Sequence, residues 1–360
     1  MTNSSTPTRF SRRHVLGGLI AGAGAGLAAP MPGRAEDDGV APPAKPEAIS
    51  ITARPIAHFE RDRPDVKRFG DLEFRGGLVL TSPSTHFGGW SGLVMEADGG
   101  SLFAVSDTGS WLTADVKYEG SRPVGLSGAR IGPILDTKGR VLTKKGEQDA
   151  ESVTLVEGTL ARGSLLIGFE RQHRIGRFEI RDRELRSPTG HLKMPAETRR
   201  MSANQGIEGL TVLAAGPLKG TVVGFAERLT RGSGYHTGWL WLGGEPKSFQ
   251  LRDIDQFNIT GAAGLPDGGL LVLERYFRWT EGVKMRIRHL AAGEIKPGAR
   301  LDGRVLVRAD SGFEIDNMEG IAVHRGRGGE TVVTLISDDN FNSLLQRTLL
   351  LQFTLAASRP

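Results

Sequence analysis

Short apolar runs separated by Gly-containing turns recur five times along the chain from residue 88 onward. Each copy has a polar start, an apolar run, a turn with Gly, and a second apolar run that ends in a carboxylate. The copies span residues 88–107, 149–170, 204–227, 258–274 and 316–338. When Ser91, Glu151, Glu208, Thr260 and Glu319 are aligned, successive copies lie 60, 57, 52 and 59 residues apart. Self-similarity at a nearly constant period is typical of repeat architectures, so we predict five structural units.

The residues between copies contain two further strand-like runs per unit, which gives four strands per unit. A four-stranded repeat is the anatomy of a β-propeller blade. Helical periodicity is almost absent, which disfavours α/β folds. We therefore predict an all-β fold, a β-propeller of five blades. A sixth blade stays open as an alternative if Ile49–Phe59 contributes more than an edge strand.

The last unit supplies only three strands, the third over Thr348–Leu355. A ring of blades leaves no free edge only when every blade is complete. The apolar segment Leu72–Leu80 is the available fourth strand. We predict that it pairs with the last unit and closes the ring by joining the two ends of the domain.

Residues 1–35 have the composition of an export signal, with Arg12-Arg13 before the uncharged stretch Val15–Ala29. Fifteen weakly apolar residues are too short to cross a bilayer core of about 30 Å, so no stable membrane span is expected. The segment resembles a twin-arginine signal, which implies the twin-arginine export machinery as a partner and a periplasmic or secreted location. The alternative is a basic, unstructured N-terminus. We assign 36–47 to a Pro-rich linker and 48–360 to the propeller domain.

The net charge of +5 does not indicate nucleic-acid binding. Four Arg and no acidic residue precede Glu36, so the remainder carries only about +1, and its attraction to phosphate backbones is weak. The chain has no Cys, which excludes disulfides, Cys-ligated metals and a thiol nucleophile. Neither a Walker loop nor His residues at metal-ligand spacing occur in the sequence.

Polar side chains, most of them carboxylates, mark both ends of each predicted hairpin. Because the first two strands of a blade are antiparallel, the start of the first and the end of the second lie at the same face. The starts contribute Glu151, Glu208 and Glu319, with Ser91 and Thr260 in the other two copies. The ends contribute Asp107, Glu170, Glu227, Glu274 and Asp338. Eight carboxylates are thus expected at one mouth of the central channel, where they require cations to stay ionised.

Two kinds of strand end predict two kinds of chemistry. Three second strands end in Glu-Arg, and the guanidiniums of Arg171, Arg228 and Arg275 suit phosphate or carboxylate oxygens. Together with Glu170, Glu227 and Glu274 they form our predicted site for a small-molecule substrate. A mixed ring of acids and arginines is what a metal-assisted site for phosphoesters would contain, which implies a phosphorylated substrate. The other two end in Ser-Asp, and we predict that Asp107, Glu319, Asp338 and Asp339 bind a hard divalent cation such as calcium or magnesium. His173 is the candidate catalytic general acid. The alternative is that the Glu-Arg pairs only hold neighbouring blades together.

The segments FGGWSGL, LFAVSDTGSWL, DAESV, FERQHRIGRF, NQGIEGL, LLVLERYFR, DNMEGIAV and ISDDNFNSLLQRTLLLQF occur in this order over roughly 71–355. In these segments the chain resembles the phytase-like family, known for esterase-like activity of phytase, of exported bacterial proteins. The resemblance implies a β-propeller and calcium-dependent hydrolysis of phosphoesters or esters. Ser152 departs from the pattern, in which Gly follows the acid. Two hypotheses stay open: such a hydrolase, and a non-enzymatic propeller that binds a sugar, lipid or protein at the same mouth.

Overall fold

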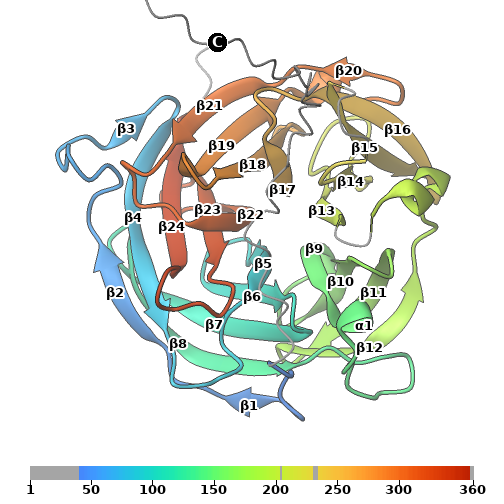
Figure 1. The fold of residues 1–360 in the computed structure, drawn as a ribbon, viewed down its shortest axis with the longest axis horizontal. Helices are drawn as coiled ribbons and strands as arrows, with labels where there is room; N and C mark the ends of the chain where they lie inside the picture. The colour runs from blue at the N-terminus through green and yellow to red at the C-terminus, as the bar shows by residue number, and fades with distance from the viewer. Residues whose placement is uncertain (1–39, 203–204, 230–233, 357–360) are drawn as a thin grey trace, which may run out of the picture.

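The protein forms a ring of five β-sheets around a central channel (Figure 1). The structure is a computed structural model and describes residues 40–202, 205–229 and 234–356. Each sheet is a blade whose innermost strand lines the channel, and successive strands lie farther from it. The predicted all-β propeller is therefore confirmed with five blades. The predicted signal segment 1–35 lies outside the described residues.

Four antiparallel strands form the body of each blade. From the channel outward, blade 1 contains β5 (Trp90–Met95), β6 (Ser101–Ser106), β7 (Ser110–Glu119) and β8 (Arg122–Pro133). Blade 2 contains β9 (Ala150–Gly158), β10 (Arg162–Phe169), β11 (Arg174–Arg181) and β12 (Glu184–His191). Blade 3 contains β13 (Ile207–Val212), β14 (Val222–Ala226), β15 (Tyr235–Leu242) and β16 (Glu245–Arg252). Blade 4 contains β17 (Asn258–Gly264), β18 (Leu270–Arg278), β19 (Gly282–Leu290) and β21 (Arg304–Ala309). Blade 5 contains β22 (Asn317–Arg325), β23 (Thr331–Asp338), β24 (Thr348–Leu355) and β4 (Leu72–Thr81).

Short elements cover the outer edges and the connections. At the edges, β1 (Glu47–Ala48) pairs with β8, β2 (Thr52–Ile56) and β3 (Arg68–Phe69) pair with β4, and β20 (Arg300–Leu301) pairs in parallel with β16. The helical turns are α1 (Lys145–Gln148), η1 (Ala196–Arg200) and η2 (Ala292–Glu294). None of the helices in the described parts of the chain is long and apolar enough to cross a membrane.

Strand β4 closes the ring as predicted. It pairs antiparallel with β24 from Leu72 opposite Leu355 to Leu80 opposite Thr348. The segment Ile49–Phe59, the candidate for a sixth blade, contributes only the edge strand β2. The last blade is thus built from both ends of the domain.

Apolar side chains pack between blades rather than in one central core. Among the described residues they form five clusters, each made by two neighbouring blades. For example, Phe103 and Trp111 of blade 1 pack with Leu165 and Ile167 of blade 2. Both faces of each sheet are therefore buried, which explains why the inner strands are continuously apolar instead of alternating.

The innermost strands approach each other closely. A Cβ at Gly261 of β17 would lie 2.8 Å from the backbone oxygen of Glu319, and one at Gly320 of β22 would lie 2.9 Å from Cβ of Leu93. In blade 2 the matching residue is Ser152, whose hydroxyl donates to the carbonyl of Ile207 in blade 3. Glycine thus allows the close approach of the innermost strands, and in blade 2 the serine forms a hydrogen bond between blades instead.

Candidate functional site

A β-bulge occurs at the same place in the innermost strand of all five blades. In blade 1, Trp90 lies opposite Ser106 and Gly92 opposite Val105, so Ser91 has no partner in the ladder. The equivalent extra residues are Glu151, Glu208, Thr260 and Glu319. A bulge bends the strand and redirects a side chain. The aligned positions of the repeat are thus the bulge positions, and their side chains are all buried.

In four blades, the carboxylate at the end of the second strand occupies the same position relative to the bulge of the first strand. Asp107 and Glu170 follow the last paired residue of β6 and β10, and Glu227 follows that of β14. Asp338 pairs with Asn317, the residue before Met318. In blade 4 this place belongs to Arg275, which pairs with Asn258, while Glu274 pairs with Ile259. We call the end of the channel where these residues and the bulges lie the mouth.

Glu274 therefore lies in a different environment from Glu170 and Glu227, contrary to the expectation that all three occupy the mouth. A shift of one residue along a strand turns the side chain to the opposite face. Glu274 is fully buried within blade 4, where Arg286 Nε donates to its Oε2 over 2.6 Å and Arg288 donates to its Oε1. Arg286 and Arg288 also donate to the carbonyls of Ile254 and Arg252. The glutamate thus joins blades 3 and 4.

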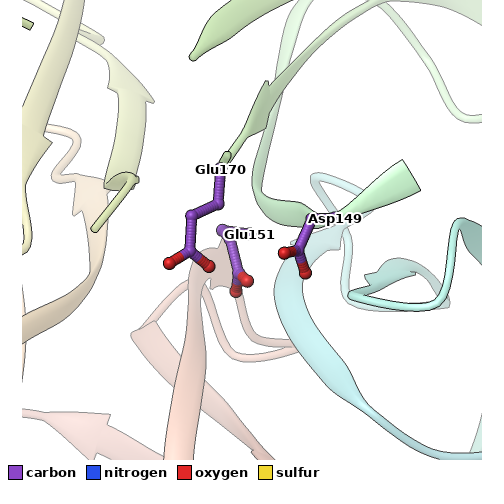
Figure 2. Close-up of side chains that lie close together, drawn as sticks. All are labelled: Asp149, Glu151 and Glu170. Atoms are coloured by element: carbon purple, nitrogen blue, oxygen red, sulfur yellow. The ribbon is translucent and has the colours of Figure 1, made fainter. Parts of the chain in front are cut away.

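Three carboxylates of blade 2 gather at the mouth (Figure 2). Asp149, Glu151 and Glu170 each offer an oxygen within 4.8 Å of the other two. All three side chains are buried, with relative exposures of 1%, 0% and 0%. Glu151 is the bulge residue of β9, Asp149 directly precedes β9, and Glu170 directly follows β10. We call this group the blade 2 triad.

Two cations contact the blade 2 triad through Asp149. Arg171 Nε donates to Asp149 Oδ2 over 2.6 Å, and Lys145 Nζ lies 3.2 Å from Oδ1. Lys145 also donates to Asp107 Oδ2 over 3.0 Å and so links blades 1 and 2. Burial opposes the charge of Lys145, but Asp107 and Asp149 outweigh it and raise the lysine pKa above its ordinary value. Lys145 and Arg171 thus place two cations against the carboxylates of blades 1 and 2.

A second acidic group lies across blades 5 and 1. Asn317 Nδ2 donates to Glu319 Oε1 over 2.9 Å and to Asp338 Oδ2 over 3.3 Å. Burial, followed by the charges of Glu319 and Asp107, raises the pKa of Asp338 well above its ordinary value. Glu319 Oε2 is buried and accepts no hydrogen bond from the described residues. Glu319 and Asp338, two of the four predicted calcium ligands, thus share the Asn317 amide, and the charges of Asp107 and Asp339 also act on Asp338.

The fourth predicted ligand, Asp339, is engaged in shaping a loop. Its Oδ1 accepts hydrogen bonds from the backbone N–H groups of Gly89 and Phe341, each over 3.1 Å. Its Oδ2 accepts one from the Thr348 hydroxyl over 2.9 Å. Asp339 therefore ties the loop after β23 to the start of blade 1, and its role as a calcium ligand stays a prediction.

The predicted arginines lie at the mouth in different pairings. Arg228 Nε donates to the Asn258 amide oxygen over 3.1 Å, and the Asn258 amide donates to Glu227 Oε1 over 2.9 Å. Arg275 lies 3.6 Å from Glu319 Oε1. These pairings join blade 3 to blade 4 and blade 4 to blade 5, as the structural alternative expects. The arginine side chains keep partial exposure, 19% for Arg228 and 25% for Arg275.

His173 lies in the turn between β10 and β11, three residues after Glu170. Its Nδ1 is buried and has no hydrogen-bond partner among the described residues. The neighbouring Arg174 stacks over the Phe169 ring, 3.8 Å from its centroid. The structure thus positions His173 at the mouth, and its catalytic role stays a prediction.

Asp149 and Lys145 are site residues that the sequence analysis did not identify. Asp149 and Glu151 flank Ala150 as Asn317 and Glu319 flank Met318. This polar–apolar–polar pattern at the start of β9 and β22 is a signal that could have identified Asp149. Lys145 belongs to α1, within the long connection between blades 1 and 2. Nothing in the repeat indicates it, because the connection lies outside the repeated strands.

The chain is similar to solved structures and to one protein family. No curated protein matches the chain. One chain of a solved S. cerevisiae Dbp5 complex with Nup159 and Gle1 is similar at 10% identity with a TM-score of 0.35, over 81% of this chain and 96% of that chain. The β-propeller domain of Myceliophteria thermophila Cps50 (Swd1) is similar at 9% identity with a TM-score of 0.37, over 86% and 98%. The model of the phytase-like family, described as esterase-like activity of phytase, matches residues 85–341, and the chain therefore belongs to that family.

Proposed function

We propose that the protein is an exported hydrolase that cleaves ester or phosphoester bonds at the mouth of the propeller with the help of bound calcium. The observation that carries this proposal is the blade 2 triad, three buried carboxylates within 4.8 Å of one another. Burying like charges together is costly unless a cation compensates for them. Membership of the phytase-like family supports the reaction class.

The donor atoms at the mouth suit calcium. They are carboxylate oxygens, with the amide oxygen of Asn317 in the second group, and hard divalent cations prefer such ligands. Asp149, Glu151 and Glu170 would hold one ion. Asp107, Glu319 and Asp338 are the second candidate ligand set, which follows the sequence-based prediction. Bound calcium would supply positive charge that polarises a phosphoryl or carbonyl oxygen.

The chain's own cations would bind and orient the substrate. Arg171, Arg228 and Arg275 each keep a partly exposed side chain at the mouth. A guanidinium has five N–H donors, so each arginine can hold its present partner and donate to a substrate oxygen. Arg275 Nε has no hydrogen-bond partner among the described residues. His173 would donate a proton to the leaving oxygen.

Exposed apolar side chains near the mouth favour the non-enzymatic alternative. Trp279 is 81% exposed in the turn between β18 and β19, and Leu344 and Leu345 are 94% and 80% exposed in the loop between β23 and β24. Both connections emerge on the mouth side of neighbouring blades. Large exposed apolar groups indicate contact with another molecule. A propeller that only binds an apolar ligand or partner at this face would use Trp279, Leu344 and Leu345 for that contact.

Calcium is expected to raise the melting temperature of the mature protein. Binding to the folded state alone stabilises it by about 2.7 kcal/mol when free calcium is a hundredfold above Kd. Glu151→Gln should remove most of the rise if the blade 2 triad binds the ion, whereas Asp338→Asn should remove it if the second group does. The measurement is calorimetric melting with and without calcium. Asp62→Asn, an exposed acid outside both groups, is the control.

A melting temperature that does not respond to calcium would contradict metal binding at either group. The reaction is tested separately with p-nitrophenyl phosphate and p-nitrophenyl acetate, in calcium and in EDTA. Turnover of one substrate that calcium increases and Glu151→Gln reduces would support the hydrolase. A calcium response without turnover of either ester would favour the binding alternative.

Export is expected to depend on the arginine pair of the leader. Replacing Arg12 and Arg13 by Lys keeps the positive charge but removes the twin-arginine motif. The precursor should then accumulate in the cytoplasm of a bacterial host, as measured by cell fractionation. Arg34→Lys, in the same leader but outside the motif, should leave export unchanged. Normal periplasmic amounts of the double variant would argue against the twin-arginine assignment.

A further inference from the structure

A pocket lies on the face of the propeller opposite the mouth, where the closing blade meets blade 1. Its volume is about 400 Å³, which falls in the range of sites for small ligands. The turn after β5 and the end of β7 form one wall, and β4 with the end of β22 forms the other. We call it the seam pocket; it is lined by Arg75, Ala97, Val116, Tyr118, Arg325 and Arg327, among others.

Tyr118 provides a fixed aromatic surface in the seam pocket. Its hydroxyl donates to the Gly99 carbonyl over 3.0 Å and accepts from Gln352 Nε2 over 2.9 Å. Burial raises the pKa of this phenol, so it stays uncharged at neutral pH. Val116 and Ala97 extend the apolar lining. A planar or aliphatic group can therefore pack here without displacing hydrogen bonds.

Positive charge exceeds negative charge around this surface. Arg75 is already neutralised by an ion pair with Glu330 and donates to the Ser121 carbonyl over 3.0 Å. The Arg325 guanidinium forms no hydrogen bond or ion pair with any other described residue. The Arg327 guanidinium lies 5.5 Å from the centroid of the Tyr118 ring and forms no hydrogen bond or ion pair within the described part of the chain.

The remaining ionisable groups of the pocket do not cancel this charge. Asp98 is the acidic residue of the lining, and its Oδ1 already accepts a hydrogen bond from the Gly100 N–H over 2.8 Å. Burial lowers the pKa of His324, so the ring is neutral at neutral pH. Its two nitrogens contact the Arg325 carbonyl and the Thr334 hydroxyl. Apart from Arg75, the lining of the seam pocket therefore carries two arginines, Arg325 and Arg327, and one carboxylate, Asp98.

We propose that the seam pocket binds a small organic anion, a carboxylate with a planar apolar body, through Arg325 and Arg327 beside Tyr118. A guanidinium donates well to a carboxylate, and attraction to the Tyr118 ring holds the Arg327 guanidinium beside the aromatic surface. The site lies at the opposite end of the blades from the acidic mouth, whose charge would repel such a ligand. Its occupancy is therefore independent of the calcium site.

The test is isothermal titration calorimetry of the mature protein with 2-naphthoate and with the uncharged 2-naphthamide. We expect saturable binding of naphthoate, and binding of the amide weaker by about tenfold or more, because charge-assisted hydrogen bonds are lost. The double variant Arg325→Gln, Arg327→Gln should lose about the same factor for naphthoate. Ala97→Phe, which narrows the pocket without changing its charge, should weaken both ligands.

Two controls keep the result specific. Arg54→Gln removes an exposed arginine of β2 that is not part of the lining, and Asp338→Asn alters the mouth; neither should change naphthoate affinity. Naphthoate should also slow amide exchange in segments 97–100 and 325–328. No saturable binding, equal affinity for acid and amide, or a double variant that binds like the wild type would overturn the proposal. So would a loss of affinity in Asp338→Asn.

Discussion

Removing strand β4 is expected to abolish the cooperative unfolding of the propeller. The strand covers the whole length of β24 and buries Leu72, Leu78 and Leu80 at the junctions of blade 5. Losing a single buried leucine side chain costs about 2–5 kcal/mol, and a domain has only about 5–15 kcal/mol of stability. Without β4 the ladder edge of β24 is also unpaired, and such edges promote aggregation.

The experiment compares two shortened chains by calorimetry and sedimentation. A chain that begins at residue 83 lacks β4 and should be insoluble or melt without a cooperative transition. A chain that begins at residue 57 lacks β1 and β2 but retains β4, and it should melt cooperatively at a moderately reduced temperature. If the shorter chain melts like the longer one, closure through β4 does not stabilise the ring.

The architecture could be predicted because it repeats. Regular spacing of the hairpins indicated five units, and the incomplete last unit required a strand from the other end, which is β4. The two-residue strands β1, β3 and β20 could not be predicted, since two residues carry no periodicity. These short strands form where a connecting segment runs beside an outer strand of a blade. The path of such a segment is set by the folded structure and not by a local sequence pattern.

The site could be predicted less completely, and Glu274 shows why. Its sequence context, Glu-Arg after an apolar run, matches that of Glu170 and Glu227. The strand continues through Arg278 in blade 4, however, and the ladder places Arg275 where the other blades have an acid. Sequence similarity cannot detect a shift of one residue, but that shift decides which face the side chain occupies. A residue predicted to bind substrate is instead buried between two arginines.

The second prediction follows from this burial. Glu274→Gln is expected to destabilise the protein by about 3–5 kcal/mol, because it removes the buried counter-charge of Arg286 and Arg288 and leaves Arg286 only the more exposed Asp255, 3.6 Å away. Burial already lowers the pKa of Arg288, an effect that Glu274 partly offsets. Glu227→Gln changes the glutamate of another Glu-Arg pair, at the partly exposed mouth. It should change the unfolding free energy by less than about 1 kcal/mol.

Chemical denaturation of the two variants measures this difference. A third variant, Glu274→Leu with Arg286→Met and Arg288→Met, removes the whole ionic group. It therefore separates the loss of the ion pairs from the cost of burying the two arginine charges without Glu274. Replacing a whole buried ionic group by apolar residues is often neutral, so this variant should recover part of the stability that Glu274→Gln loses. Recovery should stay incomplete, because the carbonyls of Arg252, Ile254 and Asp302 lose their arginine donors. Equal stability of Glu274→Gln and the wild type would mean that the arginines find other compensation. The glutamate would then be free for a role other than holding blades 3 and 4 together.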